Sequence, residues 1–164
     1  MSRFFPHAEY AEDQPLAYII LTTHVLTRGA TTGAIIGAAS FAAAAAAPSS
    51  LSTPNRGLFL QAAGRGTTIG TALLAVALVG RMWGREDIEW KDRSWRLLHN
   101  KGQVECDDWT YGGAVAGVGA AAVGGMLRGA GWRGVVGAGG LGSVPGTVGY
   151  MGWRYGVKGG KFEE

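Results

Sequence analysis

The residues that could perform chemistry are few and scattered along the chain. The stretch GAGGLG, residues 137–142, has the G-x-G-x-x-G spacing of a loop that holds the pyrophosphate of a dinucleotide. Such a loop needs a strand before it, a helix after it and an acidic residue about 20 positions further on. Pro145 would break that helix early, and the last acidic residues are Glu163 and Glu164. The sequence therefore argues against a cofactor-binding loop.

The other reactive residue types form no recognisable site. His7, His24 and His99 lack the partner spacing of a metal centre. Cys106 is the only cysteine, so it is interpreted as an ordinary thiol, with an intermolecular disulfide as the alternative. The net charge is only +3 and no basic block is present, which is not the pattern of a nucleic-acid-binding protein. We expect no catalytic site, no metal, no cofactor, no nucleic acid and no small-molecule substrate.

A few ionisable residues border the apolar parts of the chain. Asp107 and Asp108 directly precede Trp109. They are interpreted as carboxylates at the N-terminus of a helix, where the helix dipole favours negative charge. His24 is interpreted as a polar residue on an interfacial turn. None of these three is assigned a chemical role.

Composition indicates where the elements lie. Glycine accounts for 29 of the 164 residues and charged residues for 16%, against ordinary shares of about 7% and 25%. Residues 29–48, 66–80, 109–127 and 134–153 contain no charged residue and no histidine. About 20 apolar residues cross a ~30 Å hydrocarbon core. The shorter second stretch can also cross this core if the side chains of Arg65 and Arg81 extend to the two membrane interfaces.

These stretches predict an all-α integral membrane protein with four transmembrane helices in two hairpins. The spans are expected at about 29–47, 65–82, 109–127 and 134–153. A soluble bundle is the alternative, but it would need charged outer faces that these stretches lack. Aromatic residues at the ends of the stretches, such as Trp109, Trp132 and Trp153, are typical of a lipid interface.

The remaining segments complete a single membrane domain over residues 29–156. Residues 1–28 are expected to form a polar N-terminus and an interfacial helix, with a break near Gly29 because a joined helix would be longer than the bilayer is thick. Residues 84–108 form the one sizeable polar connection and predict an ordered surface loop with a helical turn. Residues 157–164 are expected to be a short C-terminal tail.

Small residues recur at four-residue spacing in all four apolar stretches. Positions i and i+4 lie on one helix face, so each set forms a flat strip where another backbone can approach. Lipid offers no hydrophobic drive for helix association, which leaves close van der Waals packing to supply it. The competing explanation is that frequent glycine produces such spacings by chance. The expected helix-packing residues are Gly29, Gly33 and Gly37 in the first stretch and Gly66 and Gly70 in the second. In the third stretch they are Gly113, Gly117, Ala121 and Gly125, and in the fourth they are Ala138, Gly142 and Gly146.

The segment DDWTYGGAVAGVGAAAVGG, residues 107–125, carries a family resemblance, supported by RGTTIGTALLAVAL before the polar connection. The chain resembles the four-helix superfamily of mitochondrial inner-membrane protein-import translocase subunits. Its branch of greatest similarity is the complex I accessory subunit of the alpha subcomplex subunit 11 type, and a fungal complex I subunit of similar build is equally compatible. The likeness covers residues 16–156 in architecture and is specific only over 107–125.

The resemblance implies a multi-pass protein of the mitochondrial inner membrane that has no catalytic site of its own. It implies an accessory subunit that stabilises the membrane arm of respiratory complex I, the NADH:ubiquinone oxidoreductase. The expected partners are the membrane-arm subunits and phospholipids, including cardiolipin.

The import-channel branch is the alternative, as a subunit of an inner-membrane protein or metabolite translocase. Its members resemble one another in having polar or acidic residues in a cavity within the spans, and the apolar stretches here contain no acid. The orientation also has two readings. The distribution of Lys and Arg predicts termini in the matrix, whereas the resemblance implies the intermembrane space, which we adopt.

Overall fold

The computed structural model describes residues 4–47 and 55–162, and this part of the chain is helical with no β-strand. The prediction of an all-α protein is confirmed. The end of the first apolar stretch at Pro48 lies outside the described residues. The helices are α1 (Ala17–Ala45), α2 (Arg56–Met82), α3 (Asp87–His99), α4 (Lys101–Val123) and α5 (Gly131–Met151), with a 3₁₀ turn η2 (Ala11–Asp13) and a π-helical continuation of α5, η3 (Gly152–Val157).

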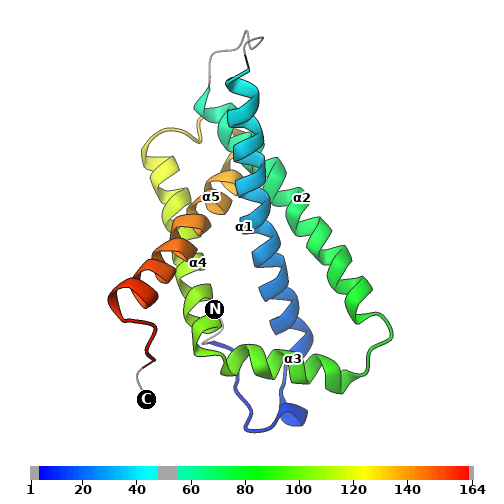
Figure 1. Cartoon of the computed structure of the whole chain (residues 1–164). Helices are drawn as coiled ribbons and strands as arrows, with labels where there is room; N and C mark the ends of the chain where they lie inside the picture. Colours follow the sequence, from blue (N-terminus) through cyan, green and yellow to red (C-terminus); the bar gives the residue numbers. More distant parts are fainter. Residues whose placement is uncertain (1–3, 48–54, 163–164) are drawn as a thin grey trace.

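The long helices form two antiparallel pairs, α1 with α2 and α4 with α5 (Figure 1). Contacts of α5 with α2 and α1 join the two pairs. Helix α3 lies across one end of the bundle, and both chain termini lie at that same end (Figure 1). The C-terminal end of α1 lies beyond the turn between α4 and α5 (Figure 1).

Local sequence explains where these helices begin and end. The side chain of Asn55 accepts a hydrogen bond from the amide of Gly57 and so caps α2. Asn100 ends α3 and caps α4 by accepting from the amide of Gln103. The turn between α4 and α5 contains Gly125 at φ +67°, a left-handed conformation that costs glycine little.

Two predicted boundaries are wrong. We expected a break near Gly29, but α1 runs through it without interruption. Close packing of Gly29 on α2 offsets the low helix propensity of glycine. Residues 84–108 were expected to be a loop, but they contain α3 and the first turns of α4. Asp107 and Asp108 therefore lie inside α4 rather than at its N-terminus.

The expected helical span over 134–153 contains Pro145, and α5 does continue through it to Met151, so the argument that Pro145 would break a helix after residues 137–142 does not hold. A proline removes one backbone donor, and neighbouring helices can stabilise the chain on both sides of it. The stretch 137–142 lies within the same helix. Its glycines are therefore not in a strand-to-helix loop.

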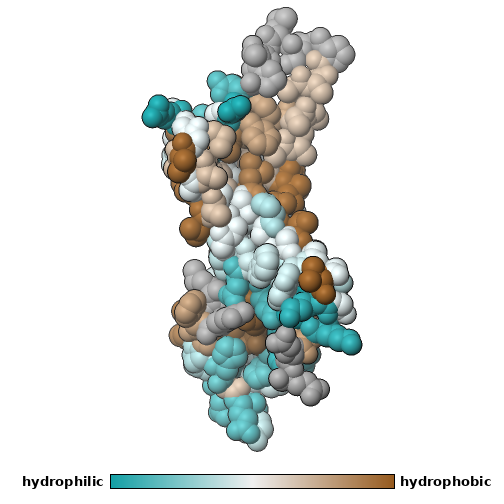
Figure 2. Space-filling view, turned by 90° about the vertical axis from the view of Figure 1, so that its left-hand side faces the viewer, coloured by the Kyte–Doolittle hydropathy of each residue, from teal (hydrophilic) through white to brown (hydrophobic). Residues whose placement is uncertain are grey.

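The surface of the bundle is apolar over much of its length. Side chains on the outer face of α2 are largely exposed, with Ile69 at 60%, Leu73 at 63% and Val76 at 71%. Figure 2 shows hydrophilic residues gathered at the lower end, a smaller hydrophilic group near the upper end, and mostly neutral or apolar residues between.

Composition alone qualifies fewer helices for a membrane than we predicted. Among the described residues, α2 is the one helix long and apolar enough to cross a bilayer by length and hydropathy. Four were expected. The difference has a physical origin, since α1 contains His24 and Arg28, α4 begins with polar residues, and glycine itself adds little hydropathy.

Candidate functional site

The seam between α1 and α2 is built from glycines. A Cβ atom added at Gly33 would lie under 3.0 Å from the backbone of Gly66, and one at Gly29 would meet the carbonyl of Gly70 equally closely. Gly37 faces the backbone of Ala62 in the same way. Backbone here lies on backbone, so a side chain at these positions would force the two helices apart.

The seam between α4 and α5 repeats this construction. Gly113 faces Gly142 and Gly146, and Gly117 faces Ala138 and Gly142, each so closely that an added Cβ would lie under 3.0 Å from backbone atoms. Of the expected helix-packing residues, Gly125 is the one that falls outside these contacts. It lies in the turn after α4, with open space around it, so its assignment as a packing residue is wrong.

A third seam, between α2 and α5, was missed. An added Cβ at Gly137 would collide with the carbonyl of Leu60, and one at Gly64 with the carbonyl of Arg133. Gly140 faces Thr67. The available signal was that glycines occur on two faces of α5, which indicates a helix packed on both sides.

Hydroxyl groups cross the same interfaces. Thr31 and Ser143 lie 2.8 Å apart between α1 and α5. The Oγ1 atoms of Thr110 and Thr147 lie 2.8 Å apart between α4 and α5. Each hydroxyl also contacts a carbonyl of its own helix, so few polar atoms in the bundle interior lack a partner. Such contacts stabilise helix pairs by about 0.6 kcal/mol each in membranes.

A partly buried ion-pair cluster, centred on a buried carboxylate, joins α1 to α4. Asp107 is 3% exposed and its carboxylate accepts from Arg28 Nη2 at 2.5 Å and from His24 Nδ1 at 2.9 Å. Because a carboxylate only accepts, His24 must carry the proton on Nδ1. Thr27 and Tyr111 add a hydroxyl contact of 2.7 Å between the same helices. The cluster fixes two helices from different hairpins.

Sequence reasoning did not find this cluster. His24 was interpreted as a residue on an interfacial turn, but it lies inside α1 and contacts a carboxylate 83 positions away. No spacing rule connects such distant residues. The signal was physical, because an arginine and a histidine in an apolar helix require an acidic partner.

A second buried cation lies where the chain leaves α5. Arg154 is 4% exposed; it donates to the carboxylate of Glu105 on α4 and to the carbonyl of Lys161 at 2.6 Å. Its guanidinium also lies 4.3 Å from the centre of the Phe162 ring. These contacts hold η3 and the segment after it against the end of α4.

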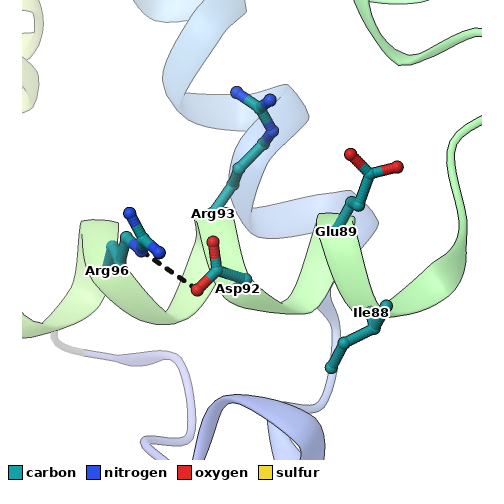
Figure 3. A pocket seen from close by; sticks show the side chains of 5 residues that line it. All are labelled: Ile88, Glu89, Asp92, Arg93 and Arg96. Carbon is teal, nitrogen blue, oxygen red and sulfur yellow. Dashed lines mark hydrogen bonds and ion pairs between the residues drawn. The ribbon is translucent and has the colours of Figure 1, made fainter.

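Helix α3 is the polar element of the molecule. Ser94 donates to the carbonyl of Ala17 at 2.7 Å, which ties the buried side of α3 to the start of α1. The hydrogen bond from Lys91 lowers the pKa of Asp87, helped by a hydrogen bond from Tyr18. On the opposite side, a shallow hollow of about 470 Å³ is lined by Ile88, Glu89, Asp92, Arg93 and Arg96. Figure 3 shows the pairing of Arg96 with Asp92 in this hollow.

The described residues contain no group of three or more potential ligands that could hold a metal ion. The space beside Asp107 is about 10 Å³, which is close to the minimum for one water molecule. The arrangement therefore suits helix packing, and the buried charges are used to hold helices together.

The fold and these contacts define a class of protein: an all-helical bundle closed by glycine seams and by ion pairs between its hairpins. Within that class the chain belongs to the family described as "Protein of unknown function (DUF1757)", which matches residues 2–138. The match includes α1 to α4 and the first two turns of α5. No curated protein matches the sequence significantly.

Proposed function

We propose that this protein is a four-helix membrane protein whose function is structural: it packs its own helices tightly and offers its outer faces to lipid and to partner subunits. The observation that carries the proposal is the contrast between the two sides of α2. Its inner face is closed by glycine against backbone, whereas Ile69, Leu73 and Val76 on its outer face are more than half exposed. Such a face favours a lipid or protein environment over water.

The positions of three arginines support a placement of the bundle across a membrane. Gly64 contacts the carbonyl of Arg133, so Arg65 on α2 lies at the level of Arg133 on α5. From Arg65 to Arg81 the rise along α2 is about 24 Å at ~1.5 Å per residue. With both side chains extended, this approaches the ~30 Å of a hydrocarbon core.

In this placement α1 crosses the membrane with a different segment from the one its composition suggests. The pairs Gly29–Gly70 and Gly33–Gly66 set the register of the first hairpin. Extending that register places residues 18–34 of α1 beside residues 65–81 of α2. The α1 span proposed here therefore contains Arg28, and most of the uncharged stretch 29–47 lies beyond it.

The ion pairs make this span acceptable in lipid. A lone charge at the middle of a membrane helix costs about 2.5–3.5 kcal/mol on insertion scales. Arg28 and His24 on α1 are both bonded to Asp107 on α4. A hydropathy count made helix by helix misses this pairing, so it underrates α1 and α4.

We further propose that the host assembly is mitochondrial respiratory complex I, where the chain acts as an accessory subunit in the inner membrane with its termini in the intermembrane space. The resemblance over residues 107–125 is the ground for this choice. The alternative is a subunit of an inner-membrane protein-import or metabolite translocase. The acid-free spans that argued against it no longer do so, since Asp107 lies inside α4. However, the space beside Asp107 is only about 10 Å³, which is too small for a conducting path.

Native gels of mitochondria followed by mass spectrometry separate these assemblies. We expect the chain to migrate with NADH dehydrogenase activity and with membrane-arm subunits. Migration with the import machinery instead would favour the alternative. Migration with neither would contradict both assignments.

A further inference from the structure

An apolar groove runs along the outer side of the α1–α2 seam. It encloses about 450 Å³. The groove exists because the seam has glycine on both helices, so its floor is backbone, while larger side chains form its walls. Its lining is Gly33, Ile36, Gly37, Ser40 and Phe41 from α1, and Ala62, Arg65, Gly66, Ile69, Gly70 and Leu73 from α2.

Arg65 is the one charged residue in this lining. It is exposed and makes no hydrogen bond or ion pair with the described residues. Ser40, the other polar side chain of the groove, already donates to the carbonyl of Ile36 at 2.8 Å. The groove thus combines an apolar trough with one unpaired cation.

The level of Arg65 in the bundle adds a second observation. Arg65 follows Gly64, which contacts the backbone of Arg133 on α5. Next to Arg133, Trp132 is 61% exposed, and the guanidinium of Arg133 lies 5.3 Å from the centre of its ring. Exposed tryptophan and arginine at one level are typical of the headgroup region of a bilayer.

We propose that this groove binds an anionic phospholipid, with Arg65 pairing with its phosphate and an acyl chain lying along Ile69 and Leu73. The inference rests on the proposed membrane location. A second copy of the chain fits the groove poorly, because a two-fold contact would place Arg65 against Arg65 of the partner subunit. A phosphate satisfies Arg65, and an acyl chain covers the part of the trough that Ile69 and Leu73 line on the membrane side of Arg65.

Photo-crosslinking in nanodiscs tests the proposal. The full-length chain is reconstituted in phosphatidylcholine with a trace of phosphatidylglycerol that carries a photoreactive acyl chain, and the modified peptides are identified by mass spectrometry. We expect crosslinks at Ile69 and Leu73. Arg65→Gln should reduce them about fivefold, which corresponds to the ~1 kcal/mol that one arginine contributes near anionic lipid.

Three controls make the result specific. Arg65→Lys keeps the charge and should retain most of the crosslinking. Arg81→Gln removes an exposed arginine from the other end of α2 and should change nothing at Ile69. Photoreactive phosphatidylcholine should label the groove less than phosphatidylglycerol and should not respond to Arg65→Gln.

Two failures are distinguishable. If the chain enters nanodiscs but groove labelling is equal for Arg65→Gln and the unaltered chain, or if chain-to-chain crosslinks occupy the groove, the lipid site is wrong and the membrane proposal stands. If the chain does not enter nanodiscs at all, the membrane proposal fails and the lipid site fails with it.

Discussion

Gly117 and Gly119 lie on the same helix yet have opposite surroundings. An added Cβ at Gly117 would lie under 3.0 Å from backbone of α5, whereas nothing lies within 4 Å of one at Gly119. The pair therefore separates the packing role of glycine from its low helix propensity, which is the same at both positions.

Gly117→Leu should destabilise the bundle by about 1–3 kcal/mol, the usual range for overpacking a close contact. Gly119→Leu should leave the stability unchanged or raise it by up to about 0.8 kcal/mol, because leucine has the higher helix propensity and nothing crowds it. Thermal unfolding in mild detergent measures both variants. Equal loss in the two would mean that the seam between α4 and α5 does not depend on close backbone contact. Gly33→Leu should behave like Gly117→Leu at the other seam.

Asp107 is the carboxylate that pairs with both Arg28 and His24 inside the bundle. Asp107→Ala leaves the partly buried Arg28 without its carboxylate partner and should cost about 1.5–3 kcal/mol, the range for hydrogen bonds to charged groups. Asp92→Ala, which breaks the exposed pair with Arg96, should cost at most ~1 kcal/mol. Chemical unfolding compares the two.

A double-mutant cycle distinguishes the pair from general damage at this site. Asp107→Ala combined with Arg28→Met removes both charges, so its cost should be smaller than the sum of the two single costs. Strictly additive costs would contradict a direct Arg28–Asp107 interaction.

At the scale of elements, α3 offers a test that depends on pH. The folded-state pKa of Asp87 lies below its ordinary value because Lys91 donates a hydrogen bond at 3.0 Å. A lowered pKa means that the pair stabilises α3 above the unfolded pKa of about 3.9, and that this contribution is lost as the pH falls through the folded value.

Lys91→Gln should therefore raise the pKa of Asp87 toward its ordinary value. Carboxyl NMR titration of the intact protein measures the shift. Arg56→Gln, at the far end of the bundle, should leave the pKa of Asp87 where it is. A pKa of Asp87 that stays the same after Lys91→Gln would show that the Lys91–Asp87 contact does not form in solution.

The elements also show what the sequence could and could not predict. Uncharged stretches located four long helices, because 15 to 20 consecutive residues without a charge are typical of a buried or lipid-facing helix. Helix ends were misjudged where polar residues continue an apolar helix, as at the start of α4. Asn100 was the available signal, since it caps the helix that holds Asp107.

The register between paired helices could not be predicted from the sequence. The stretch 29–47 and the stretch 66–80 look like two spans of one hairpin, yet the contacts Gly29–Gly70 and Gly33–Gly66 offset them along the bundle. Only pairing between helices determines such an offset. The same applies to the cluster of His24, Arg28 and Asp107, whose members come from different hairpins.

On the scale of the whole molecule, α3 and both ends of the described chain lie at one end of the bundle, and α1 extends furthest at the other (Figure 1). On the face drawn in Figure 2, most hydrophilic residues lie at the end that holds α3, and a smaller group lies near the other end. The last turns of α1 at that second end are apolar. This arrangement supports the proposal of a membrane protein that contributes to an assembly through its outer surfaces.

Alkaline carbonate extraction of the native membranes tests the central claim, that this bundle resides in lipid, most directly. The account predicts that the chain stays in the membrane pellet with an established multi-pass protein, while a peripheral protein is released as a control. Recovery of the chain in the supernatant as a water-soluble monomer would contradict the account.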